Sequence, residues 1–232
     1  MKSARLPQHR GGLSYSQIAV GMNLAVANAH RLWSDAALLA EHGRTPSAVA
    51  LAILSIEESG KVPLLRQLAL ATDDTERREF WKAYRSHRQK NTLWIFGQLV
   101  AKGGRTLEDL RSIVDPDSDH PDTLDNLKQL CLYTDCFIDG KWSSPNNLAI
   151  SEIAPYLLTM AKVLSEAREV TSVEVELWQK HLLSVKDGTF ESSKRAVADW
   201  YAELQLRGLA TVSTDELEAF LGTHTAALQA SG

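Results

Sequence analysis

The sequence predicts an all-α protein, a bundle of long antiparallel helices with a short extended hairpin and a C-terminal helical appendix. Apolar residues recur at alternating steps of four and three over long stretches, which is the spacing of one helix face. Three capping-box patterns mark expected helix starts, at Ser14/Gln17, Thr171/Glu174 and Ser213/Glu216. Only residues 133–142 have the pattern of a β-hairpin, with Asp139 and Gly140 as turn residues.

The N-terminal part predicts two helices of different character. The first starts at Ser14 and ends at Gly43, because glycine tolerates the left-handed conformation that terminates a helix. Its apolar face comprises Ile18, Met22, Ala25, Ala29, Leu32, Ala36 and Leu39. The second starts at Thr45 and is apolar on every side over residues 48–56, so neighbouring helices should surround it. Pro63 should kink or interrupt this second helix.

A third long helix is predicted from residue 74 or 75 to the glycines at 103–104. One stripe of this helix carries Phe80, Tyr84, His87, Asn91 and Trp94, so that two polar residues interrupt an aromatic face. The other elements expected before the appendix are a short helix capped by Thr106 and Asp109, an acidic loop at 115–122, a helix at 123–133 and a long helix at 150–167.

The 232 residues fit an N-terminal arm at 1–13, a helical domain at 14–170 and a helical appendix at 171–232. Hydrophobic residues make up 44%, which is enough for a core and too many for a disordered chain. The longest apolar run, residues 48–56, is far shorter than the roughly 20 residues of a membrane span. No signal-peptide pattern is visible either. We therefore expect a cytoplasmic protein without a membrane partner.

Composition also limits cofactors and partners. Cys131 and Cys136 fit a reducing compartment, and no second cysteine pair could complete a zinc site, so we expect neither metal nor cofactor. The net charge of −4 gives no overall attraction for RNA. Residues 76–90 are nevertheless basic, with six lysines and arginines against Glu76 and Glu79. This patch predicts contacts with RNA phosphates, or else a solvated helix face.

Glu57, Glu58 and Lys61 follow the apolar run of the second helix. Lys61 lies one helical turn beyond both glutamates, and a carboxylate buried alone is costly. One glutamate should therefore pair with Lys61 or with a cation from another helix. The alternative is a helix end that emerges into water and carries a surface ion pair.

His87 and Lys90 lie one turn apart on the third predicted helix. Histidine is the side chain best placed to exchange protons near neutral pH, and lysine could stabilise negative charge developing on a phosphate. The alternative is a core histidine that hydrogen-bonds to Asn91 or to a backbone carbonyl.

Taken together, four segments resemble the AbiV family of abortive-infection proteins, which belongs to the wider HEPN group of helical domains. The segments are AVANAHRLWSDAALL (25–39), ALAILSIEESGK (50–61), HRQK (87–90) and LKQLCLYTD (127–135), in the order of the family. The resemblance covers residues 14–168 and implies a HEPN-like bundle. Matched to its motifs, the candidate residues are Asn28, Asp35, Glu57, Glu58, Lys61, His87, Lys90, Lys128, Tyr133 and Asp135.

The resemblance implies phage defence, triggered by a phage or host protein. HEPN proteins are commonly metal-independent ribonucleases, and many form homodimers in which two copies build one cleft. In them an arginine and a histidine four to six residues apart promote attack of the RNA 2′-hydroxyl on the adjacent phosphate. This chain departs from that spacing, because Arg85 is too close to His87 and Arg77 and Arg78 are too far.

These observations lead to one catalytic hypothesis and two alternatives. If the second and third helices pack side by side, His87 acts as general acid or base, and Glu58 or Glu57 orients it. Lys61 and Lys90 hold the phosphate in this hypothesis, and the further candidates for binding are Arg85, Arg88, Asn91 and the remaining family positions. The alternatives are a non-catalytic protein that captures a phage or host protein, and a buried polar network that only holds the helices in register.

Overall fold

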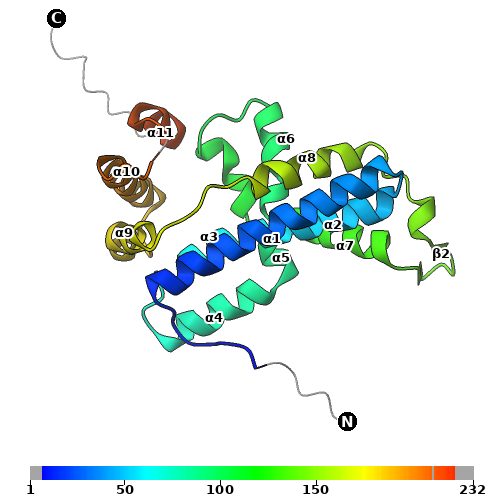
Figure 1. The fold of residues 1–232 in the computed structure, drawn as a ribbon, viewed down its shortest axis with the longest axis horizontal. Coiled ribbons are helices and arrows are strands. Elements are labelled where there is room, and N and C mark those ends of the chain that lie inside the picture. Colours follow the sequence, from blue (N-terminus) through cyan, green and yellow to red (C-terminus); the bar gives the residue numbers. More distant parts are fainter. Residues whose placement is uncertain (1–6, 211, 223–232) are drawn as a thin grey trace, which may run out of the picture.

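The computed structural model describes residues 7–210 and 212–222, and Figure 1 shows their arrangement. The all-α prediction is confirmed, because the strands among these residues form only one small antiparallel hairpin. Of the expected arm and appendix, residues 1–6, 211 and 223–232 lie outside the described part of the chain.

The α-helices before the hairpin are α1 (Tyr15–Glu41), α2 (Thr45–Ser59), α3 (Lys61–Leu68), α4 (Asp74–Arg85), α5 (His87–Lys90), α6 (Phe96–Ala101) and α7 (His120–Leu132). The hairpin pairs β1 (Asp135–Cys136) with β2 (Trp142–Ser143). The α-helices after it are α8 (Ile153–Ser165), α9 (Ser172–Leu182), α10 (Phe190–Leu206) and α11 (Thr214–Leu221). Short 3-10 helices are η1 (Leu93–Ile95), η2 (Glu108–Val114), η3 (Pro145–Asn147) and η4 (Leu183–Val185).

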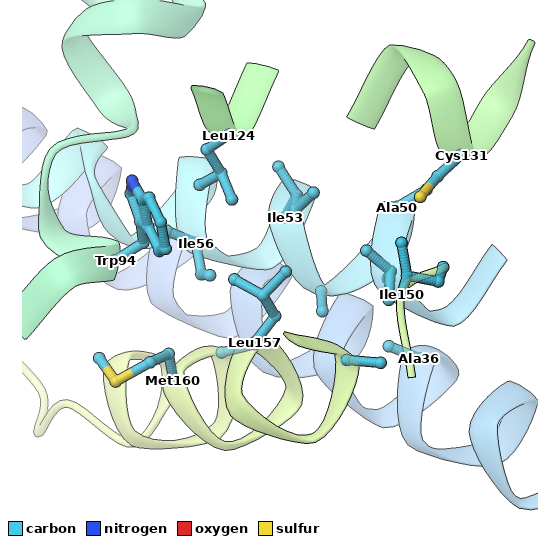
Figure 2. Packing of buried hydrophobic residues seen from close by; sticks show 14 residues of the cluster. Ala36, Ala50, Ile53, Ile56, Trp94, Leu124, Cys131, Ile150, Leu157 and Met160 are labelled. Atoms are coloured by element: carbon cyan, nitrogen blue, oxygen red, sulfur yellow. The ribbon is translucent and has the colours of Figure 1, made fainter. Parts of the chain in front are cut away.

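Helix α2 forms the centre of the bundle, as its apolar sequence predicts. It packs against α1, α7 and α8, and the side chains of Ala48, Ile53 and Ile56 are inaccessible to solvent. Figure 2 shows Ile53 and Ile56 of this helix facing Leu157 of α8 within one core. Because α2 is surrounded, a charged side chain near its end has to find a partner inside the protein.

Helices α9 to α11 stand beside the bundle, and an extended connection, residues 166–171, joins them to α8 (Figure 1). Trp178 of α9 and Trp200 of α10 fix them to α3 by enclosing the side chain of Arg66. The guanidinium carbon lies 5.2 Å from the Trp178 ring centre and 4.9 Å from the Trp200 ring centre. Burial lowers the pKa of Arg66, and cation–π contact with both indoles helps to offset the lost hydration.

The expected helix starts at Ser14, Thr171 and Ser213 are confirmed as capping boxes. The expected interruption by Pro63 is misplaced, because α2 already ends at Gly60. Pro63 lies in the first turn of α3, where a missing backbone N–H breaks no helical hydrogen bond.

The prediction of one continuous third helix is wrong, because the chain forms α4, α5, η1 and α6 instead. Ser86 adopts an extended backbone with φ −80° and ψ 128°, and its hydroxyl accepts a hydrogen bond from the backbone N–H of Gln89. Asn91 ends this single turn. The two breaks allow the turn from His87 to Lys90 to pack against both α2 and α7.

Candidate active site

Glu57, in the last turn of α2, is the centre of a charged cluster and is only 2% exposed. Its Oε2 lies 2.7 Å from Nδ1 of His87 and 3.7 Å from Nζ of Lys90. Its Oε1 lies 2.5 Å from Nζ of Lys128. The sequence could not decide which glutamate faces inward, and the structure assigns this place to Glu57. Three basic groups from α5 and α7 thus surround one buried carboxylate.

His87 forms the outer part of this cluster. Its side chain is 54% exposed, because Ser86 caps α5 and leaves the ring at the start of the turn. A hydrogen bond from Nδ1–H to the Glu57 carboxylate leaves Nε2 of the neutral ring as a proton acceptor. The expected alternative, a His87 ring hydrogen-bonded to Asn91 or to a backbone carbonyl, is not found among the described residues, because the ring contacts Glu57 and Lys128. With the buried Glu57 carboxylate behind it, the exposed imidazole of His87 can take up and release a proton at Nε2.

Lys90 and Lys128 form the inner part, with side chains that are 9% and 4% exposed. Burial lowers the pKa of Lys90, and the charge of Glu57 opposes this effect. Burial acts in the same direction on Lys128, but the ion pair with Asp125 and the hydrogen bond to Glu57 outweigh it and raise the pKa. Both lysines therefore serve as counter-charges to Glu57, and the expectation that Lys90 holds a phosphate does not fit its burial.

Gly60 allows α5 to come this close to α2. A Cβ atom at Gly60 would lie 2.1 Å from the backbone oxygen of Lys90, far inside a van der Waals contact. The glycine is in ordinary helical conformation, with φ −64° and ψ −11°. Its role is thus to leave room for the backbone of Lys90.

Glu58 and Lys61 form a pair of their own at the rim of the cluster. Nζ of Lys61 lies 2.5 Å from Oε1 of Glu58, and each side chain is 19% exposed. The ammonium also lies 5.5 Å from the ring centre of Tyr84. Charges of both residues act on Lys90, so the pair is near the cluster without being part of it.

The two arginines expected to bind RNA, Arg85 and Arg88, both have partners within the protein. Arg85 donates hydrogen bonds to the backbone oxygens of Trp81 and His9, so it fixes the N-terminal segment to α4. Arg88 donates to the backbone oxygens of Pro116 and Ser118 and pairs with Asp122 at the start of α7. Its side chain remains 46% exposed.

Other family positions lie away from Glu57. Asn28 and Asp35 both accept hydrogen bonds from Arg31 on the surface of α1. Tyr133 ends α7 and is 60% exposed, and Asp135 is an exposed residue of β1. Within the described ranges, no hydrogen bond or ion pair joins these four to the cluster. Asn91 is completely buried, and its side-chain amide has no hydrogen-bond partner among the residues described.

Asp125 is a member of the cluster that the sequence did not indicate. Its Oδ1 lies 2.6 Å from Nζ of Lys128, three residues later on α7. The pattern Asp-x-x-Lys on a helix was a usable signal, because residues three apart face each other. Glu57, His87 and Asp125 also present three donor atoms within 4.8 Å of one another, a set that could hold a metal ion.

A groove of about 670 Å³ lies between α3 and α4, and none of the cluster residues lines it. Ser86 and Gln89, on either side of His87, contribute to its wall. Its charged residues are mixed in sign, namely Glu76, Glu79, Lys82 and Lys186, so the groove has no overall attraction for a polyanion.

Comparison with known protein families shows which family the chain resembles. The family model for HEPN-type AbiV proteins matches residues 17–166, which is well over half of the chain. No curated protein and no solved structure matches. Among the described residues, no helix has the length and apolar character required to cross a membrane.

Proposed function

Because the chain belongs to the AbiV family of HEPN-type proteins, we propose that it acts in abortive infection as a metal-independent ribonuclease with His87 as its catalytic residue. Family membership supports the role in phage defence. The step is attack of a ribose 2′-hydroxyl on the adjacent phosphate. The O2′–P bond forms, the P–O5′ bond breaks, and the products are a 2′,3′-cyclic phosphate and a 5′-hydroxyl.

One observation carries this proposal: an exposed imidazole whose Nδ1 is held by a buried carboxylate. Nε2 takes the 2′-hydroxyl proton, and Glu57 stabilises the imidazolium that results. The proton then passes to the leaving O5′. Arg88 is the candidate for the phosphate contact, because it follows His87 and is partly exposed.

Several initial roles are revised in this proposal. Glu57 orients His87, while Glu58 is engaged by Lys61. Lys90 and Lys128 neutralise Glu57. Their burial keeps both ammonium groups from an external phosphate. Asn28, Asp35, Tyr133 and Asp135 have no role in the chemical step.

His87→Ala is expected to lower the rate of RNA cleavage about 10²- to 10⁴-fold, the usual contribution of general acid–base catalysis. The assay uses cellular RNA and tRNA with a chelator present, and circular dichroism checks the fold. The variant should remain folded, because the His87 ring is half exposed.

His30→Ala provides a matched control, since His30 is an exposed histidine in the middle of α1. It should cleave like the wild type. Full cleavage by a folded His87→Ala variant would reject His87, and cleavage that requires a divalent ion would reject the metal-independent mechanism.

A second candidate function, capture of a phage or host protein, is favoured by the hairpin. Phe137 is 49% exposed, Trp142 is 76% exposed and Ile138 is fully exposed. Exposed apolar groups in one place are typical of interaction surfaces. The homodimer that the family implies could use the same surface.

The combined change Ile138→Asp and Trp142→Asp separates the two functions. If capture is the function, this variant loses phage protection in cells, whereas His87→Ala keeps it. If cleavage is the function, His87→Ala loses protection. Sedimentation of wild type and hairpin variant would show whether the surface also joins two copies.

A further inference from the structure

The ammonium group of Lys128 lies at the meeting point of three donor atoms. It is 2.5 Å from Oε1 of Glu57, 2.6 Å from Oδ1 of Asp125 and 3.2 Å from Nδ1 of His87. These residues come from α2, α7 and α5, which are separate in the sequence. A single cation thus touches every acidic or imidazole group at the centre of the cluster.

This donor set is one that divalent transition metals use. Two carboxylates and an imidazole nitrogen bind Zn²⁺ at about 2.0–2.2 Å. The carboxylate distances to Nζ are longer than this by about half an ångström, and the imidazole distance by about one. Asp125 and His87 are partly exposed, at 31% and 54%, so their side chains have room to close around a smaller ion.

We propose that Lys128 is the resident cation of this centre and positions Glu57, Asp125 and His87 as a divalent metal ion would. The tethered ammonium keeps the two carboxylates together, and the Glu57 carboxylate that it anchors accepts the Nδ1–H of His87. Without it, the three ligands form a site for a cation of the Zn²⁺ class. The consequence for RNA cleavage rests on the proposed function, whereas the cation centre itself does not.

Lys90 does not have this role, although it is also buried and also faces Glu57. Its Nζ lies 3.7 Å from a single carboxylate oxygen, and no ion pair joins it to Asp125 in the described part of the chain. Lys90 is therefore a matched control: it shares the burial and the charge of Lys128, but not the central place.

The test uses the untagged full chain with Lys128→Ala and, as probes, Co²⁺ followed by visible absorption and Zn²⁺ followed by calorimetry. We expect one Co²⁺ per chain in the variant, bound at least tenfold more tightly than by the wild type or by Lys90→Ala. Adding Asp125→Ala or His87→Ala to the variant should remove this gain, because ligand number determines affinity.

Lys128→Ala could also unfold the chain, and this outcome tests the proposal too. Metal binding would then be coupled to folding, so that Zn²⁺ restores the helical circular dichroism signal of Lys128→Ala but not that of Lys128→Ala/Asp125→Ala. A folded variant without added Co²⁺ affinity, or an unfolded variant that Zn²⁺ does not refold, would overturn the proposal.

Cleavage assays distinguish this inference from the proposed function. If the wild type cleaves RNA, Lys128→Ala should lose cleavage and methylammonium should restore part of it. If the wild type does not cleave RNA but Lys128→Ala gains the Co²⁺ site, the proposed function fails and the cation centre stands.

Discussion

Glu57→Gln is expected to lower the free energy of unfolding by about 3–5 kcal/mol and the rate of RNA cleavage by at least 10²-fold. The change keeps the shape of the side chain and removes its charge. Lys128 and Lys90 then remain buried without their common counter-ion, and breaking a buried pair in this way has a cost of that size. The neutral amide of glutamine also cannot stabilise the His87 imidazolium as the Glu57 carboxylate does. Urea unfolding and the cleavage assay measure the two effects.

Two further variants show whether the charge is the cause. Glu58→Gln is the matched control, since it neutralises the adjacent glutamate, whose pair with Lys61 lies at the rim; we expect a clearly smaller loss of stability than for Glu57→Gln. Adding Lys90→Met to Glu57→Gln should recover part of the stability, because Lys90 loses its ion-pair partner in Glu57→Gln whereas Lys128 keeps Asp125, but it should not recover cleavage. Equal effects of Glu57→Gln and Glu58→Gln would contradict the central place of Glu57.

Periodicity was sufficient to predict the helices that bury one continuous face. The apolar stripe of α1 and the all-round apolar sequence of α2 predict a helix packed on a central helix, and the structure has this arrangement. Local patterns report local structure well, because capping groups and faces act within one or two turns.

The break at Ser86 could also have been found, because Ser86 and Gln89 have the serine-x-x-glutamine spacing of a helix start. The aromatic stripe that continues through His87 concealed it. The residues of this stripe lie on α4, α5 and η1. Separate short helices can each turn an apolar face toward the protein interior, so the spacing of apolar residues alone does not reveal the break.

The sequence predicted that Glu57 and His87 meet if the second and third predicted helices pack side by side. The pairing of Lys128 with Glu57 was not predictable in the same way, because Lys128 lies 71 residues away on α7. Sequence spacing orders residues on one helix and says nothing about which of two buried lysines reaches the carboxylate. That choice depends on tertiary packing, so Lys128 could be included only through the family motif.

Gly60→Ala is expected to destabilise the protein by about 1–3 kcal/mol or more, although helix propensity alone predicts the opposite sign. Replacing glycine by alanine in helical conformation usually stabilises by up to about 1 kcal/mol. Here the added Cβ would lie 2.1 Å from the backbone oxygen of Lys90. A backbone atom cannot rotate away, so α5 has to move, and overpacking of this kind outweighs the gain in propensity.

Gly21→Ala is the control that separates the two effects. Gly21 lies within α1, and its added Cβ would meet a methyl group of Leu65 at 3.5 Å, an ordinary contact. This variant should be as stable as the wild type or slightly more stable. Because α5 carries His87 and Lys90, Gly60→Ala should also lower RNA cleavage, whereas Gly21→Ala should not. If Gly60→Ala raised the melting temperature as propensity predicts, α5 would not be packed against the end of α2, and the contact between Glu57 and His87 would lose its structural basis.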